Sequence, residues 1–259
     1  VQTLDMLARI SGLGDHGYSP VFSHDGTRLW VPHGGKRSGI SVIDVSRRLT
    51  GPRVVFSSNR DGEGYQLYCM DADGSAAFRL TQHRGSDRAA KWSPNGSQIA
   101  FVAHGEIFVT SVEHQDTRRI TDTPEQERSV SFSPDGRSLL YAGERGGSWN
   151  LYRTDLVDDA EPSFFNATAF EEKPVLVTGL ETFQPRFSPD GTEVAFLEER
   201  TALKVLNLAS GAIRTILPGD VNYSYADGDQ WYEWSPDGKW FTVEFLSPKR
   251  WSSEVGLAP

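Results

Sequence analysis

The chain has 259 residues, 37% hydrophobic and 24% charged, so it can bury a sizeable core and is too apolar to be disordered. Its 35 acidic residues outnumber its 26 basic ones, and the net charge of −9 argues against a protein that binds nucleic acid through bulk positive charge. No stretch approaches the roughly 18 apolar residues of a membrane-spanning helix. We therefore expect a turn-rich globular protein, a monomer that neither binds nucleic acid nor inserts into a membrane.

A four-residue turn motif, Ser-Pro-Asp-Gly or a close variant, recurs five times. The copies lie at residues 23–26, 93–96, 133–136, 188–191 and 235–238, and each follows an aromatic residue. Proline fixes φ, aspartate can accept a hydrogen bond from the following backbone, and glycine tolerates positive φ, so the motif is typical of a tight turn. We call it the tetrad. A turn that recurs in one context indicates a repeated supersecondary unit.

Short runs of β-branched and aromatic residues predict strands throughout the chain, with no competing helical period. A short strand is expected before each tetrad. In chain order the other expected strands are 29–31, 40–45, 54–56, 66–71, 78–81, 99–102, 107–110, 117–121, 139–141, 151–154, 174–177, 194–197, 203–207, 213–217, 240–243 and 253–257. These strands fall into units of up to four, which we label A to D, with the tetrad between A and B.

The spacing of the tetrads predicts an all-β propeller of four-stranded antiparallel blades. Successive tetrad glycines are 70, 40, 55 and 47 residues apart, and units of about 40–45 residues are typical of propellers. The longest interval contains an extra B and an extra C strand but no tetrad. We therefore predict six blades, one of them irregular at a junction near residues 46–54, with five blades as the alternative.

The two ends of the chain are expected to meet in one domain spanning residues 1–259. The last unit has a plausible C strand at 253–257 and no D strand after it. Residues 3–10 could supply that missing outer strand and close the ring, which would leave no open sheet edge. Leu4, Leu7 and Ala8 also lie at helical spacing, so an N-terminal helix is the alternative.

These repeats resemble known propeller families. Residues 53–62, with 70–75 and 79–81, resemble a TolB-type blade, and from about Ser93 to Gly256 the chain resembles the propeller of tricorn-protease homologues. The first 50 residues are more similar to blades of surface-layer and amine-dehydrogenase-like proteins. This mixture, with the short junction, indicates either natural divergence among blades or a recombined or engineered mosaic.

The resemblance implies a function but does not specify one. TolB-like propellers bind protein partners in the bacterial cell envelope, so a periplasmic or envelope location is implied. Tricorn-type propellers gate peptides for a separate protease core, and that core is absent from these 259 residues. Its hydrolytic activity is therefore not expected here.

The sequence contains no motif of a known catalytic or metal site. There is no Gly-x-Ser-x-Gly elbow, His-Glu-x-x-His helix or phosphate-binding loop. The six histidines fall in expected turns without metal-ligand spacing, and the single Cys69 excludes an intrachain disulfide. We expect neither catalysis nor a metal or other cofactor. A hydrolase-associated propeller that lacks its catalytic domain is a further alternative.

One group of residues stands out against the acidic background. In a propeller the B–C and D–A loops share one face, and five of the six expected B–C loops contain a cation. The candidate ligand-binding arginines are Arg37, Arg60, Arg145, Arg200 and Arg250. Arginines that converge at a channel mouth would favour the carboxylate of a peptide or protein ligand. The alternative is that these side chains simply point into water.

Aromatic residues accompany this basic ring. Trp149, Tyr225 and Trp231 are candidate contacts because rigid amphipathic rings make good binding anchors, although packing roles are equally compatible with their positions. An insertion at residues 155–173 could dock a partner on the opposite face, but we favour its phenylalanines covering a blade edge. The sequence therefore predicts a non-catalytic binding or scaffold domain, with an engineered propeller that has no evolved ligand as the alternative.

Overall fold

The computed structural model describes residues 16–17, 21–22, 28–34, 39–44, 53–62, 64–72, 74–82, 86–113, 116–224, 230–246 and 253–259. In these ranges the chain forms β-strands and two single-turn 3-10 helices. Every strand pairing is antiparallel, as expected from the short connections and alternating patterns. The all-β prediction is therefore confirmed.

The elements follow one another in the predicted order. They are β1 (His16–Gly17), β2 (Val21–Phe22), β3 (Arg28–Gly34), β4 (Gly39–Asp44), β5 (Arg53–Ser58), β6 (Gln66–Asp71), β7 (Phe78–Arg79), β8 (Asp87–Trp92), β9 (Gln98–Ala103), β10 (Glu106–Ser111), β11 (Thr117–Arg119), β12 (Glu127–Phe132), β13 (Ser138–Arg145), β14 (Ser148–Leu156), η1 (Phe164–Asn166), β15 (Phe170–Leu176), β16 (Thr182–Phe187), β17 (Glu193–Glu198), β18 (Ala202–Asn207), β19 (Ile213–Leu217), η2 (Gly219–Val221), β20 (Trp231–Trp234), β21 (Phe241–Leu246) and β22 (Ser253–Ala258).

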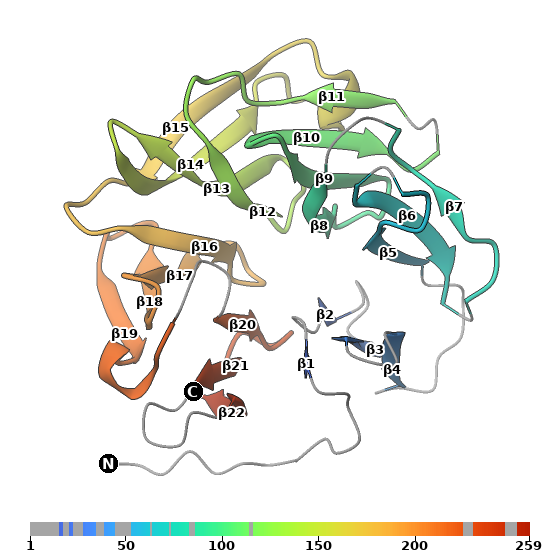
Figure 1. The fold of residues 1–259 in the computed structure, drawn as a ribbon. Coiled ribbons are helices and arrows are strands. Elements are labelled where there is room, and N and C mark those ends of the chain that lie inside the picture. The colour runs from blue at the N-terminus through green and yellow to red at the C-terminus, as the bar shows by residue number, and fades with distance from the viewer. Residues whose placement is uncertain are drawn as a thin grey trace.

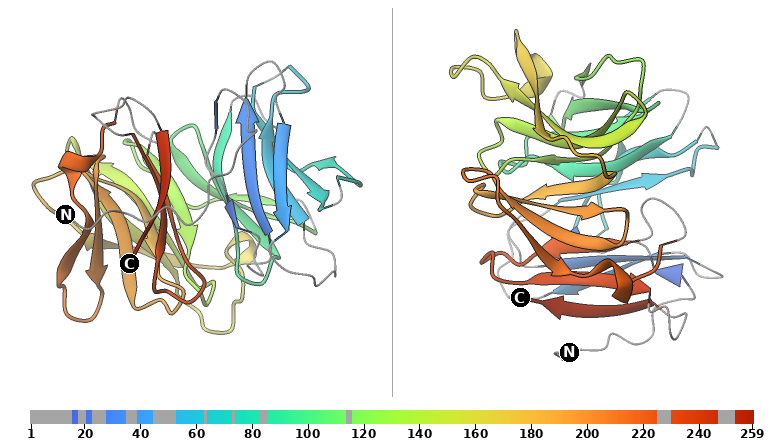
Figure 2. Two further views of the ribbon diagram at one scale, coloured as in Figure 1. Left: turned by 90° about the horizontal axis from the view of Figure 1, so that it is seen from below. Right: turned by 90° about the vertical axis from the view of Figure 1, so that its left-hand side faces the viewer.

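The strands form six antiparallel sheets arranged around a common centre, as in a propeller (Figure 1). Three sheets have four strands in sequential order, namely β8 to β11, β12 to β15 and β16 to β19. The first strand of each lies nearest the centre and the fourth lies at the rim. Figure 2 shows the sheets standing side by side around the ring when it is viewed from its edge.

The number of blades corresponds to the alternative prediction of five. Five sheets contain an inner strand, because β1 and β2 together occupy the inner edge of β3, and β8, β12, β16 and β20 begin the others. The sheet β5-β6-β7 has no strand before β5 among the described residues. The preferred prediction of six blades is therefore wrong. It counted this sheet as a blade because residues 54–56 and 66–71 have the sequence pattern of B and C strands. The expected junction near residues 46–54 is not tested, because residues 45–52 fall outside the described ranges, as do residues 3–10, the expected closing strand.

The tetrad forms the same turn in the four sheets where it is described. At residues 188–191, the Gly191 N–H donates to the Ser188 carbonyl at 2.9 Å and the Ser188 hydroxyl donates to Asp190 Oδ1 at 2.6 Å. Asp190 Oδ1 also accepts from the Thr192 N–H at 3.0 Å, and Ser188 Oγ accepts from the Glu193 N–H at 2.9 Å. The serine hydroxyl, the aspartate Oδ1 and the glycine N–H of the turn thus acquire partners before the B strand begins.

The core lies between neighbouring sheets. One cluster joins the sheets that start with β12, β16 and β20, and includes Leu140, Phe196 and Tyr232. A second cluster joins the β8 and β12 sheets around Tyr141 and Phe164. Phe164 belongs to the 155–173 insertion and is fully buried, with its ring 6.2 Å from that of Phe132. The insertion therefore covers a blade edge, as we favoured from its sequence.

Candidate functional site: the arginine face

Strand alternation decides which loops share a face of the ring. Because successive strands run in opposite directions, the B–C hairpins and the connections between sheets lie at one end, and the tetrads lie at the other. Arg60, Arg145 and Arg200 all lie at B–C hairpins: Arg60 follows β5, Arg145 is the last residue of β13, and Arg200 follows β17. We call this end of the ring the arginine face. The structure therefore brings three of the predicted arginines to one face from three different sheets.

Arg60 lies flat against the aromatic side chains of its own sheet. Its guanidinium carbon is 5.0 Å from the centre of the Phe56 ring and 4.6 Å from that of Tyr68. Its Nε donates to Ser58 Oγ at 3.2 Å. Such stacking contributes about 0.5–1 kcal/mol at an exposed site and limits the orientations of the side chain. Arg60 is exposed, so its charge faces solvent from a fixed position.

Arg145 is held by two carboxylates of its own sheet. Its Nη1 donates to Glu127 Oε1 at 2.8 Å and its Nη2 donates to Glu172 Oε2 at 3.0 Å. The guanidinium also lies 4.8 Å from the Tyr152 ring. The Glu127 side chain is fully buried. Burial raises the pKa of Glu127, and hydrogen bonds from Thr123, Thr121 and Arg145 oppose that rise. A carboxylate ligand at Arg145 would therefore compete with internal acids.

Arg200 occupies an unusual turn. It has φ +67°, and Glu199 before it has φ +50°, both in the left-handed region that non-glycine residues rarely adopt. The equivalent hairpin after β13 has Gly146 and Gly147 there. The Arg200 side chain is 43% exposed, lies 5.4 Å from the Phe183 ring and has Glu181 3.6 Å away. An exposed arginine is thus presented on a backbone that would favour glycine.

The predicted aromatic contacts are placed differently. Trp149 and Trp231 are 8% and 4% exposed. Trp149 packs against Phe183 and lies under the guanidinium of Arg128, at 4.6 Å. Their burial agrees with the alternative stated above, that these rings pack inside the protein and do not contact a ligand. Arg37, Tyr225 and Arg250 lie outside the described residues.

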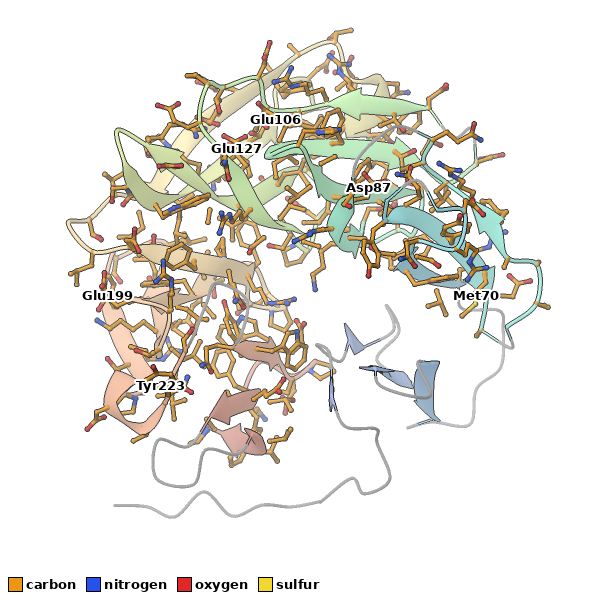
Figure 3. All side chains as sticks on the ribbon, viewed as in Figure 1. Met70, Asp87, Glu106, Glu127, Glu199 and Tyr223 are labelled. Atoms are coloured by element: carbon orange, nitrogen blue, oxygen red, sulfur yellow. The ribbon has the colours of Figure 1, made fainter. Side chains whose placement is uncertain are left out.

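The arginine face also carries exposed apolar side chains that sequence reasoning did not select. They lie in hairpins or in connections between sheets, and they are Tyr65, Val177, Leu180, Val221 and Tyr223. Glu199 and Tyr223 are marked in Figure 3 near the sheet that contains Arg200. The Asn222 Nδ2 donates to the Thr201 carbonyl at 3.3 Å, which places Tyr223 beside the Arg200 turn. The only sequence signal for these residues was that long connections are often functional.

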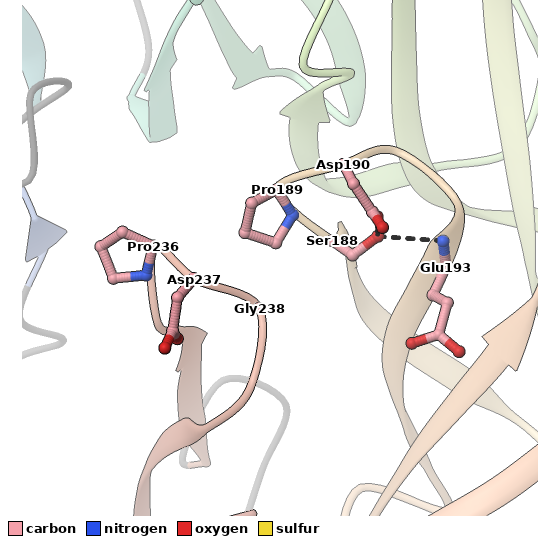
Figure 4. Close-up of a pocket in the computed structure, with 7 residues that line it drawn as sticks. All are labelled: Ser188, Pro189, Asp190, Glu193, Pro236, Asp237 and Gly238. Carbon is pink, nitrogen blue, oxygen red and sulfur yellow. Dashed lines mark hydrogen bonds between the residues drawn. The ribbon is translucent and has the colours of Figure 1, made fainter.

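The opposite face carries a cleft between two tetrads. It has a volume of about 340 Å³ and is lined by Ser188, Pro189, Asp190, Glu193, Pro236, Asp237 and Gly238 (Figure 4). The Ser188 hydroxyl lowers the pKa of Asp190, and the Ser235 hydroxyl likewise lowers that of Asp237. Glu193 pairs with Arg214. These carboxylates are therefore engaged in the turns and at the sheet edge.

Among the described residues, no group of three or more histidine, cysteine or acidic side chains is placed to hold a metal ion. Burial raises the pKa of the Cys69 thiol to about 11, so this side chain is a protonated apolar filler at neutral pH. No helix in the described part of the chain is long and apolar enough to cross a membrane.

Comparison with known families and proteins agrees with the propeller geometry. Residues 50–143 match the family model of the dipeptidyl peptidase IV N-terminal region. Over 216 residues the sequence is 26% identical to the uncharacterized peptidase YuxL of Bacillus subtilis. This match covers 78% of the present chain and 29% of YuxL. The sequence is also 29% identical to the Tol-Pal system protein TolB of Bordetella pertussis. That match covers 43% of the present chain and 38% of TolB. The chain thus spans about a third of the length of these relatives.

Among solved structures, a putative TolB from Agrobacterium tumefaciens has a similar fold. The TM-score is 0.63 at 16% identity, and the match covers 94% of this chain and 91% of that one. Together these similarities support TolB-type propeller repeats, as the sequence motifs indicated.

Proposed function

We propose that this chain is a non-catalytic propeller domain that binds a carboxylate-bearing peptide or protein on its arginine face. The observation that best supports this proposal is the repeated placement of an arginine against aromatic rings at Arg60, Arg145 and Arg200. The three come from separate sheets, so no single local motif requires their common orientation. Guanidinium groups that are fixed in advance lose less conformational entropy when they bind a carboxylate.

The backbone at Arg200 makes it the leading contact residue. Two consecutive left-handed non-glycine residues cost of the order of 1–3 kcal/mol each in stability. Glycine would remove that strain, as it does after β13, but it would also remove the exposed cation. Strain of this kind is often retained where a side chain is needed for function. We therefore assign to Arg200 the main contact with the ligand carboxylate. Arg60 is a second contact, and Arg145 can become a third once the ligand displaces Glu172.

The surroundings of Arg200 suit a peptide better than an isolated ion. The Glu199 N–H donates to the Glu181 carbonyl at 2.9 Å, which brings the connection that contains Leu180 against the Arg200 hairpin. Leu180 is 47% exposed and Tyr223 is 38% exposed. Apolar side chains around a cation can contact the side chains of a ligand while the cation binds its carboxylate.

The similarity to TolB supports protein binding and an envelope location in a bacterium. Because the match covers only part of the TolB chain, both remain part of this proposal. We also propose that the domain acts as a monomer, since its six sheets assemble within one chain.

The proposal is tested by fluorescence anisotropy with labelled acidic peptides, each with a free or an amidated C-terminus. We expect Arg200→Gln to weaken binding about tenfold, the loss of one charge-assisted interaction. Arg214→Gln is the matched control, because Arg214 is also exposed and paired with a glutamate but lies on the rim strand β19. Equal loss in both variants, or no binding by the wild type, would contradict the proposal.

Two alternatives have their own expected outcomes, and peptide binding separates the second of them from the proposal. The match to a peptidase over 78% of this chain favours a propeller that serves a hydrolase domain elsewhere. In that case peptides would bind, and neither chromogenic peptides nor esters would be hydrolysed by this part alone. A recombined or engineered propeller without an evolved ligand predicts a stable fold that binds no peptide in a broad screen.

A further inference from the structure

Four inner strands present one residue each at the same level of the ring. Lys91 on β8, Ser131 on β12, Arg186 on β16 and Glu233 on β20 each lie two residues before a tetrad serine. In register they pair with Ala100, Leu140, Ala195 and Thr242 of the adjoining B strands. The four strands surround the centre of the ring, with β12 between β8 and β16 (Figure 1). This level contains two cations, one carboxylate and one hydroxyl.

Two of the charged side chains at this level form an ion pair between neighbouring sheets. Arg186 Nη1 donates to Glu233 Oε2 at 2.7 Å, and the two side chains are only 15% and 21% exposed. Ser131 Oγ donates to the Pro185 carbonyl at 3.1 Å, so β12 contributes no ionisable group here. Lys91, from the sheet beyond β12, interacts electrostatically with both Arg186 and Glu233. Lys91 therefore lies near the Arg186–Glu233 ion pair.

The cluster has one positive charge in excess. With Lys91 protonated, Lys91 and Arg186 have a single carboxylate near them among the described residues, that of Glu233, and all three side chains are partly buried. Desolvation, with a smaller effect of Arg186, lowers the pKa of Lys91 to about 7, while Glu233 opposes the shift. A desolvated cation without its own counter-ion is costly, and an added anion removes that cost.

We propose that Lys91 and Arg186 form an anion-binding site at the centre of the ring, and that its ligand is a single carboxylate. The excess of one charge matches a monoanionic carboxylate, whereas a phosphate dianion would leave an uncompensated negative charge. Arg186 is already oriented by Glu233 and lies 5.8 Å from the Trp231 and Tyr232 rings, so the site is partly built before the ligand arrives. The site uses no residue of the arginine face, and it goes beyond the function proposed above.

The test is an NMR titration of the full chain with isotope-labelled lysine. The chain has six lysines, and Lys91→Gln assigns the Lys91 signal. Acetate at constant ionic strength is expected to raise the pKa of Lys91 by about one unit, since its protonated form then binds about tenfold more tightly than the neutral form. The exposed Lys239 is the internal control and should not respond. Phosphate is the second arm and should bind more weakly than acetate.

Two variants with opposite effects separate binding from a purely structural role. Glu233→Gln removes the internal carboxylate, so acetate should bind at least about tenfold more tightly. Lys91→Gln should abolish the binding, which can be followed by the stabilisation that acetate gives in thermal unfolding. Arg200→Gln should leave the acetate response unchanged even if it removes peptide binding. The proposal is overturned if acetate leaves the Lys91 pKa unchanged, if Lys239 responds equally, if phosphate binds more tightly, or if Glu233→Gln weakens acetate binding.

Discussion

The tetrad glycines adopt a backbone conformation that few other residues tolerate. Gly96, Gly136, Gly191 and Gly238 have φ between +69° and +73°. A Cβ added to Gly191 would lie 3.5 Å from Pro134 Cδ of the previous tetrad, an ordinary contact distance. The requirement for glycine therefore comes from the backbone angle and not from crowding.

The first prediction follows from that distinction. Gly191→Ala should reduce the free energy of unfolding by about 1–2 kcal/mol, the cost of a left-handed L-residue. Gly179→Ala is the matched control, because Gly179 does not have such a φ and a Cβ there meets nothing within 4 Å. The measurement is urea unfolding of both variants. Equal stability of the two would show that the angle carries no cost.

At the scale of elements, neighbouring sheets are joined by a buried cluster around Thr121. The Thr121 hydroxyl lies 2.7 Å from Glu106 Oε2 and 2.9 Å from Glu127 Oε2, and its oxygen accepts from the Ile107 N–H at 2.9 Å. Both glutamates lie between the β8 and β12 sheets (Figure 3). A hydroxyl has one proton and can satisfy only one of the two carboxylates. The two carboxylates therefore compete for the Thr121 proton, and burial still raises the pKa of Glu127 against the hydrogen bonds that it accepts.

The second prediction is a pH dependence that originates in this cluster. Because the pKa of Glu127 is higher in the folded than in the unfolded chain, the folded state binds the extra proton above the ordinary glutamate pKa. The free energy of unfolding should therefore fall as the pH rises from the ordinary glutamate pKa through the pKa of Glu127 in the folded chain. Glu127→Gln should make the decline shallower in denaturant unfolding between pH 4 and pH 8 (about the range in which such a carboxyl titrates). An unchanged slope would exclude Glu127 as its source.

At the scale of the whole molecule, inner strands from separate sheets place charged groups together at the centre. Lys91 and Arg186 are 95 residues apart in the chain, with the whole β12 sheet between them. Burial at the inner strands is the main cause of the lowered pKa of Lys91, and Arg186 from a separate sheet adds to it.

The third prediction concerns global stability. Because the pKa of Lys91 is about 7 in the folded chain and near 10.5 in the unfolded chain, the unfolded state binds more protons between these values. Stability should rise with pH from about 7 toward 10.5 and should level off outside that window. Lys91→Met should remove this rise, whereas Lys239→Met, at an exposed position, should retain it. Thermal unfolding in matched buffers without carboxylates provides the measurement.

The sequence by itself determined the elements that depend on local chemistry. Predicted strands such as 66–71 and 213–217 have the observed bounds of β6 and β19, because β-branched and aromatic alternation and the tetrad turns act over a few residues. The same local signals identified the face that carries Arg60, Arg145 and Arg200. They overestimated the blade count, since β5 and β6 have the pattern of B and C strands whether or not an inner strand pairs with them.

Only the tertiary structure decided what surrounds each side chain. Arg145 was predicted as a ligand contact, but its pairing with Glu127 and Glu172 depends on the register of β12, β13 and β15. The burial of Trp149 and Trp231 depends on the packing of neighbouring sheets. The proximity of Lys91, Arg186 and Glu233 requires the packing of successive sheets around one centre, which brings together residues that no local pattern relates. Local periodicity specifies strands and turns, whereas desolvation and charge pairing are set by long-range contacts.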